Sequence, residues 1–243
     1  MSANSTGSPG SPGGPGEQNH LGNRLNILRA GVLGANDGIV STAGLVLGVA
    51  ATTTERAPIL AAGLAGLVAG ALSMASGEYV SVSTQRDTER AALELERHEL
   101  ATDPEGELDE LTGFYEAKGL TPELARQVAI QLTSVEGGLA AHAEVELGIA
   151  VEHLVSPWNA AITSGLAFTF GSLLPLIAVL ITSPTLRSPV TFVAMLVALV
   201  VTGSVSARLG GADRKRAVLR VVVGGALAMA VTYGIGRLVG TAM

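Results

Sequence analysis

Two pairs of glutamates, each pair spaced three residues apart, lie in an acidic stretch in the middle of the chain. Glu96 and Glu99 form one pair, and Glu107 and Glu110 form the other. Residues i and i+3 share one face of a helix, so two helices joined by a tight break can bring four carboxylates together. Crowded carboxylates repel one another unless cations neutralise them, which suits Fe²⁺, Mn²⁺, Mg²⁺ or Ca²⁺. A solvated acidic surface rich in glutamate is the alternative.

A histidine follows later in the same acidic stretch. His142 and Glu146 are four residues apart, with Glu144 between them. On a helix these side chains add one nitrogen and further oxygens to the candidate metal site. The chain has no cysteine, which excludes thiolate ligands and Cys nucleophiles. We therefore expect a divalent cation as bound ligand, and no organic cofactor.

Other chemistries find little support in the sequence. A Walker A sequence and a His-Glu-x-x-His motif are both absent, so no nucleotide partner and no ATP-driven pumping are predicted. No constellation of nucleophile and base indicates an enzyme. The net charge of −6 disfavours a nucleic-acid partner.

Two carboxylates fall in or beside long apolar runs. A charged side chain at mid-bilayer costs about 2.5–3.5 kcal/mol, so such residues usually face a bundle interior or a water-filled path. For Asp37 we favour a functional role, whereas solvation at the headgroup level is an equal alternative for Glu78. Met74 lies one turn before Glu78 and either coordinates a transition metal or simply packs. These three residues form the predicted transport pathway.

The apolar residues are concentrated in segments that can cross a bilayer. The chain is 48 % hydrophobic and 15 % charged. Each segment has about 18–24 residues, matching the ~20 that cross ~30 Å of hydrocarbon as a helix. Pro157 and Pro189 are placed at helix starts, and Pro175 is expected to kink the third span. The segments are 31–50, 57–77, 159–182, 190–207 and 217–239.

The fold class is therefore an all-α membrane protein with a helical domain inserted between the second and third spans. Residues 84–155 hold 16 of the 21 acidic residues, which separates this insert from the apolar runs. The remaining boundaries are a disordered Ser/Gly/Pro-rich tail over 1–20, spans one and two over 21–83, and spans three to five over 156–243.

Within the insert, the second span is expected to continue as a helix. Asp103-Pro104 then begins a new helix that Gly119 ends, and Thr121-Pro122 begins a third. Gly137-Gly138 breaks the chain before a fourth helix over 139–154.

The basic residues predict an orientation. With the N-terminus in the cytoplasm, 12 of the 15 Lys and Arg residues fall inside, and only Arg56, Arg187 and Arg237 fall outside. The N-terminus and the acidic domain are therefore expected to be cytoplasmic and the C-terminus outside. Glycines four apart, such as Gly34 and Gly38, allow close helix contacts in the lipid bilayer.

Three stretches of the sequence carry a resemblance to a known family: "GANDGIVSTAGLVLGV", "SMASGEYVSVSTQRDTE" and the Glu-rich insert followed by "ELGI". The sequence resembles the vacuolar iron transporter family, in a bacterial branch. The resemblance covers about residues 21–240. It implies a homodimer of five-span subunits with a metal path at the dimer interface. It also implies export of Fe²⁺, and often Mn²⁺, from the cytoplasm in exchange for protons, and a bacterial plasma membrane location.

By the same resemblance, Asp37 and Met74 match pathway residues, and five insert glutamates match metal ligands: Glu96, Glu99, Glu107, Glu110 and Glu146. Two departures stand out. Asn26 and Ala30 occupy positions that carry carboxylates in plant-type members. His142 and Ala143 replace a methionine–glutamate pair, with Glu144 as a possible substitute.

The primary hypothesis is a proton-coupled exporter of divalent metal. The alternative is a membrane-anchored metal sensor or buffer that transports nothing. The intramembrane residues Asp37 and Met74 favour transport, because a sensor needs no ligands within the membrane.

Overall fold

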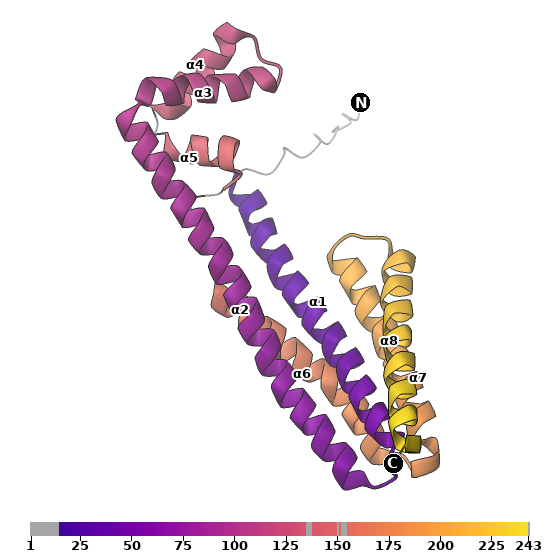
Figure 1. Cartoon of the computed structure of the whole chain (residues 1–243). Helices are drawn as coiled ribbons and strands as arrows, with labels where there is room; N and C mark the ends of the chain where they lie inside the picture. The colour runs from indigo at the N-terminus through magenta and orange to yellow at the C-terminus, as the bar shows by residue number, and fades with distance from the viewer. Residues whose placement is uncertain (1–14, 135–137, 150, 152–154, 243) are drawn as a thin grey trace, which may run out of the picture. The chain divides into compact units, whose positions relative to one another are not determined.

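The computed structural model describes residues 15–134, 138–149, 151 and 155–242, and within them the chain is helical and has no strand (Figure 1). This confirms the all-α prediction for the described part. The helices are α1 (Pro15–Ala50), α2 (Arg56–Thr102), α3 (Pro104–Ala117), α4 (Pro122–Thr133), α5 (Leu139–His142), a π-helical turn η1 (Ala143–Leu147), α6 (Pro157–Ile181), α7 (Pro184–Leu209) and α8 (Arg214–Ala242).

Five helices are long and apolar enough to cross a membrane, as predicted: Leu25–Ala50 of α1, α2, α6, α7 and Arg214–Gly240 of α8. At 1.5 Å per residue, the 47 residues of α2 extend for about 70 Å, more than twice the ~30 Å of hydrocarbon. Only the apolar first part of α2 is therefore needed to span a bilayer.

Two helix starts differ from the sequence-based prediction. Helix α1 begins at Pro15, so residues 15–20 of the expected tail are helical, while 1–14 lie outside the described residues. Helix α7 begins at Pro184, which places Pro189 inside the helix and not at its start. Membrane helices tolerate internal proline because neighbouring groups satisfy the freed backbone carbonyl. Pro175 lies inside α6 as expected.

The chain divides into two compact units. One comprises residues 1–24 and 91–154 and is called the acidic unit here; the other comprises 25–90 and 155–243 and is called the membrane unit.

Helix boundaries in the acidic unit follow local backbone chemistry. The Asp103 side chain accepts a hydrogen bond of 3.0 Å from the Gly106 amide, and Pro104 occupies the first turn of α3, as predicted. Thr121 precedes α4 without a side-chain cap. Gly148, with φ of 66°, ends η1, so the fourth helix predicted over 139–154 stops early. Residues 150 and 152–154 lie outside the described residues.

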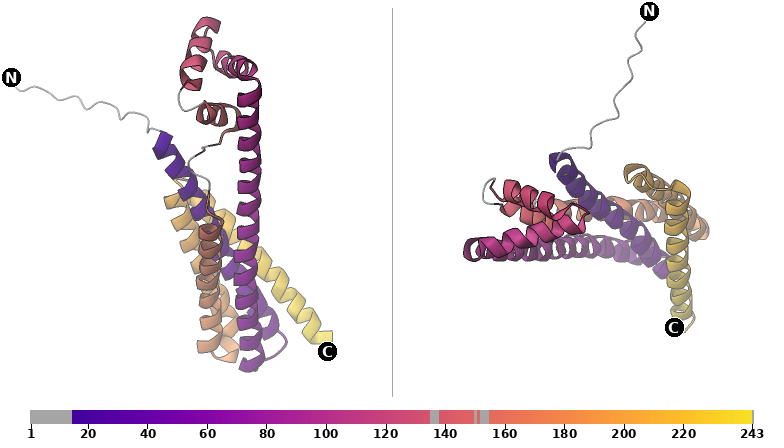
Figure 2. Two further views of the ribbon diagram at one scale, coloured as in Figure 1. Left: turned by 90° about the vertical axis from the view of Figure 1, so that its left-hand side faces the viewer. Right: turned by 90° about the horizontal axis from the view of Figure 1, so that it is seen from above.

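The core of the membrane unit forms around α1. Ile39, Ala43 and Leu47 pack with buried residues of α7 and α8, whereas Val46 packs against α2 and α6. A Cβ atom on Gly38 would meet the backbone of Phe168 in α6, so this glycine permits a close crossing of the two helices. Short turns connect α6 to α7 and α7 to α8 (Figure 2).

Candidate metal centre and membrane cavity

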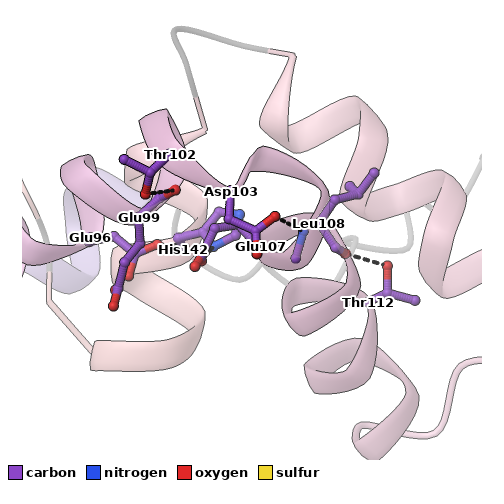
Figure 3. A network of polar contacts seen from close by, with 9 residues as sticks. Glu96, Glu99, Thr102, Asp103, Glu107, Leu108, Thr112 and His142 are labelled. Carbon is purple, nitrogen blue, oxygen red and sulfur yellow. Dashed lines mark hydrogen bonds and ion pairs between the residues drawn. The ribbon is translucent and has the colours of Figure 1, made fainter.

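Four side chains of the acidic unit converge on one point. Glu96 comes from α2, Glu107 from α3, His142 from the end of α5 and Glu146 from η1. One ligand atom from each lies within 4.8 Å of the others. Figure 3 shows three of these side chains, those of Glu96, Glu107 and His142, directed toward one another.

The local fold explains this convergence. The break between Thr102 and Pro104 turns α3 against the end of α2, and Asp103 fixes that turn as the N-cap. Gly138, with φ of 77°, then redirects the chain into α5. The wider π-helical turn that follows keeps His142 and Glu146 on the same side of the helix, and π-helical turns are frequent at functional sites.

The site is shielded from water and strongly acidic. His142 is 0 % exposed, Glu96 2 % and Glu107 8 %. Burial, together with the nearby charges of Glu146, Glu107, Glu99 and Glu110, raises the pKa of Glu96 to about 7. Burial and neighbouring carboxylates also raise the pKa values of Glu107 and Glu146. Burial lowers the pKa of His142, which favours the neutral imidazole.

Several buried atoms of this site lack hydrogen-bond partners among the described residues. They are Oε1 of Glu96, both ring nitrogens of His142 and Oε2 of Glu146. Nδ1 of His142 lies 3.1 Å from Oε1 of Glu96 and 3.6 Å from Oε2 of Glu107, without hydrogen-bond geometry. Buried polar atoms are normally paired, so such a group requires an explanation. Three carboxylates and a neutral imidazole fit a divalent cation such as Fe²⁺ or Mn²⁺.

The other predicted ligands lie outside this group of four. Glu99 is half-buried and Glu110 is exposed, although the charges of both act on the pKa of Glu96. Glu144 is exposed, and its charge contributes to raising the pKa of Tyr115.

A second feature lies in the membrane unit, where Asp37 of α1 and Met74 of α2 line the same cavity. Its volume is about 190 Å³. Sequence reasoning missed the hydroxyl groups that share this cavity. Helical spacing was the available indication, because Ser41 is one turn after Asp37 and Ser73 adjoins Met74. The full lining is Asp37, Ser41, Thr42, Leu45, Gly66, Gly70, Ser73, Met74 and Phe168.

Glu78, the third predicted pathway residue, does not line this cavity. Its Oε1 atom lies 3.3 Å from Nη2 of Arg29. The Glu78 side chain is 11 % exposed and that of Arg29 is 60 % exposed, so a largely solvated cation neutralises the carboxylate. The structure therefore separates Glu78 from Asp37 and Met74.

Comparison with known proteins gives a consistent result over most of the chain. Residues 28–237 match the VIT family. The chain is 45 % identical over 212 residues to "Vacuolar iron transporter" of Acanthamoeba castellanii, covering 87 % of this chain and 78 % of that protein. It is 37 % identical over 220 residues to "Vacuolar iron transporter homolog 2.1" of Arabidopsis thaliana, covering 90 % and 84 % of the two chains. "Vacuolar iron transporter homolog 5" of Oryza sativa subsp. japonica is 39 % identical over 216 residues, with 88 % and 81 % covered.

Proposed function

We propose that this chain, which belongs to the VIT family, is an integral membrane protein that exports Fe²⁺ from the cytoplasm. The names of its relatives refer to iron transport, and the resemblance seen in its sequence motifs is confirmed by the family match. Five helices suited to crossing a membrane provide the scaffold.

The observation that carries the proposal is the cavity shared by Asp37 and Met74. A carboxylate and a thioether from two different helices can both coordinate Fe²⁺, and hydroxyl groups beside them replace part of its hydration shell. Water occupies about 30 Å³ per molecule, so about 190 Å³ accommodates an ion with some of its water. A sensor or buffer has no need for such ligands within the membrane.

In this proposal the acidic unit captures metal before transport. The four converging side chains bind Fe²⁺, and Mn²⁺ is a second substrate because oxygen-rich sites distinguish the two ions poorly. The bias of basic residues supports a cytoplasmic acidic unit and hence export. The homodimer inferred from the resemblance is part of the same proposal.

Proton exchange is the proposed driving force. The carboxyl of Glu96, with its pKa of about 7, holds a proton near neutral pH that an arriving cation must displace. Protons and metal therefore compete for the same groups, as an antiporter requires. This chain contains no Walker A motif to supply energy from a nucleotide.

The test is a flux measurement on the full-length protein in liposomes with an imposed pH gradient. Fe²⁺ kept reduced, and separately Mn²⁺, should cross faster than in protein-free liposomes, and reversing the gradient should reverse the acceleration. Metal binding without flux would support the sensor or buffer alternative. Flux that does not change with the pH gradient would support transport but contradict proton antiport.

A further inference from the structure

We infer that the membrane unit holds an anionic phospholipid in a second cavity, between α1, α7 and α8. This cavity has a volume of about 410 Å³ and shares no lining residue with the one that contains Asp37. Leu28, Leu33 and Val221 contribute apolar walls, while Arg29 and Arg220 contribute positive charge. The inference is independent of whether the protein transports metal.

One of the two guanidinium groups at this cavity lacks an ion-pair partner among the described residues. That group is Arg220, whereas Arg29 forms an ion pair with Glu78. Four more cations flank the adjoining turn from α7 to α8, namely Arg208 at the end of α7 and Arg214, Lys215 and Arg216 at the start of α8. The acid in this turn is Asp213, and its Oδ1 atom accepts a hydrogen bond of 2.8 Å from the Arg216 amide. An anionic ligand is therefore favoured.

The apolar walls distinguish a lipid from a free anion. The side chains of Leu25 and Leu33 are 47 % and 53 % exposed, and they belong to a helix that is suited to crossing a bilayer. Acyl chains can cover such surface, whereas a free phosphate ion cannot. Basic cavities between membrane helices near the interface are a recognised form of site for anionic headgroups.

Polar side chains of α1 and α7 also line this cavity. Asn36 lines this cavity from α1, although its Oδ1 atom is buried and does not face the cavity. Thr202 and Ser206 add hydroxyls from α7. Apolar walls, guanidinium groups and hydroxyls together match a phospholipid with a phosphodiester and a hydroxylated headgroup.

The experiment is native mass spectrometry of the full-length protein in detergent, titrated with dioleoyl phosphatidylglycerol, dioleoyl phosphatidylcholine or inorganic phosphate. We expect the anionic lipid to bind at least about tenfold more tightly than the zwitterionic lipid. The negative charge of the anionic lipid is not offset by a choline cation, so its charge-assisted hydrogen bonds with the arginines are stronger. Arg220→Gln should weaken anionic lipid binding by about tenfold. Ser206→Trp, which fills the cavity and keeps every charge, should weaken it as well.

Lys215→Gln is the matched control, because it removes one charge from the start of α8 and Lys215 does not line the cavity. It should change affinity less than about twofold. Equal losses for Lys215→Gln and Arg220→Gln would overturn the site, as would equal affinity for the two lipids. Phosphate that displaces the lipid fully would indicate a free anion instead. Disulfide trapping of two Val221→Cys copies would show that a second subunit covers the cavity and would also overturn the proposal.

Discussion

Nδ1 of His142 lies 3.1 Å from Oε1 of Glu96, and neither atom has a hydrogen-bond partner among the described residues. The two side chains are 0 % and 2 % exposed, so bulk water does not reach them. A close buried contact between a nitrogen and an oxygen without a hydrogen bond is expected when both lone pairs point at one cation. This relationship supports treating His142 as a ligand and not as a core residue.

His142→Ala is expected to weaken Mn²⁺ binding by at least about tenfold, because it removes the only nitrogen from the group of four. Isothermal titration calorimetry on the full-length protein measures the change. His98→Ala is the matched control: His98 belongs to the same unit but is exposed on α2. Similar losses in both variants would contradict a ligand role for His142.

Metal affinity is expected to rise with pH. Glu96 has a pKa of about 7, so below that pH a proton must leave before a cation binds. With one displaced proton, affinity falls by about tenfold per pH unit between 7 and 5. Calorimetry at pH 6 in two buffers of different ionisation enthalpy should show about one proton released per ion. Zero release would contradict this linkage.

The same carboxyl predicts how stability depends on pH without metal. Because the folded-state pKa of Glu96 lies above its ordinary value of 4.5, its contribution to stability is fully present below about pH 4.5 and is lost as the pH rises through 7. Glu96→Gln removes the buried charge, so at pH 8 it should raise the free energy of unfolding by up to about 3 kcal/mol.

Thermal unfolding of the full-length protein tests this prediction. At pH 5 the difference between Glu96→Gln and the parent should shrink, because the parent carboxyl is then protonated. Added Mn²⁺ should stabilise the parent more than the variant. A variant that is less stable than the parent at pH 8 would show that the Glu96 charge is compensated.

Local chemistry made some of these features predictable. Asp103 followed by Pro104 is sufficient to locate the start of α3, because an N-cap and a first-turn proline act within a few residues. Glutamate spacing pointed to the two helices that contribute Glu96 and Glu107 to the group of four side chains. It could not choose Glu96 over Glu99, because that choice depends on how α2 and α3 are rotated against each other.

Other features depend on packing across the chain. The π-helical turn that carries Glu146 has no sequence rule of its own, and Glu144 faces outward there. Ser41 and Ser73 resemble the many hydroxyls of membrane helices until α1 and α2 place them around one cavity. The sequence favoured a functional role for Asp37 and left solvation as an equal alternative for Glu78, and the contact of Glu78 with Arg29 could not be read from it.

Asp37→Asn is expected to reduce Fe²⁺ flux in liposomes by at least about tenfold, because the amide keeps the shape of the side chain but loses its charge. Met74→Leu should reduce flux severalfold, since leucine preserves apolar packing and removes the thioether. Glu55→Gln is the control: Glu55 is an exposed carboxylate between α1 and α2. If Asp37→Asn transported Fe²⁺ as fast as the parent protein, Asp37 would not belong to the transport pathway.

Gly38→Ala is expected to destabilise the membrane unit by about 1–3 kcal/mol, the usual cost of overpacking. The added methyl group would meet the backbone oxygen of Phe168, which cannot move without separating α1 from α6. Gly77→Ala is the matched control, because a Cβ atom there meets nothing within 4 Å and alanine favours the helix. Thermal unfolding in detergent should therefore show a lowered midpoint for Gly38→Ala and an unchanged or raised midpoint for Gly77→Ala. Equal midpoints for the two variants would mean that α1 and α6 do not approach as closely as the structure shows.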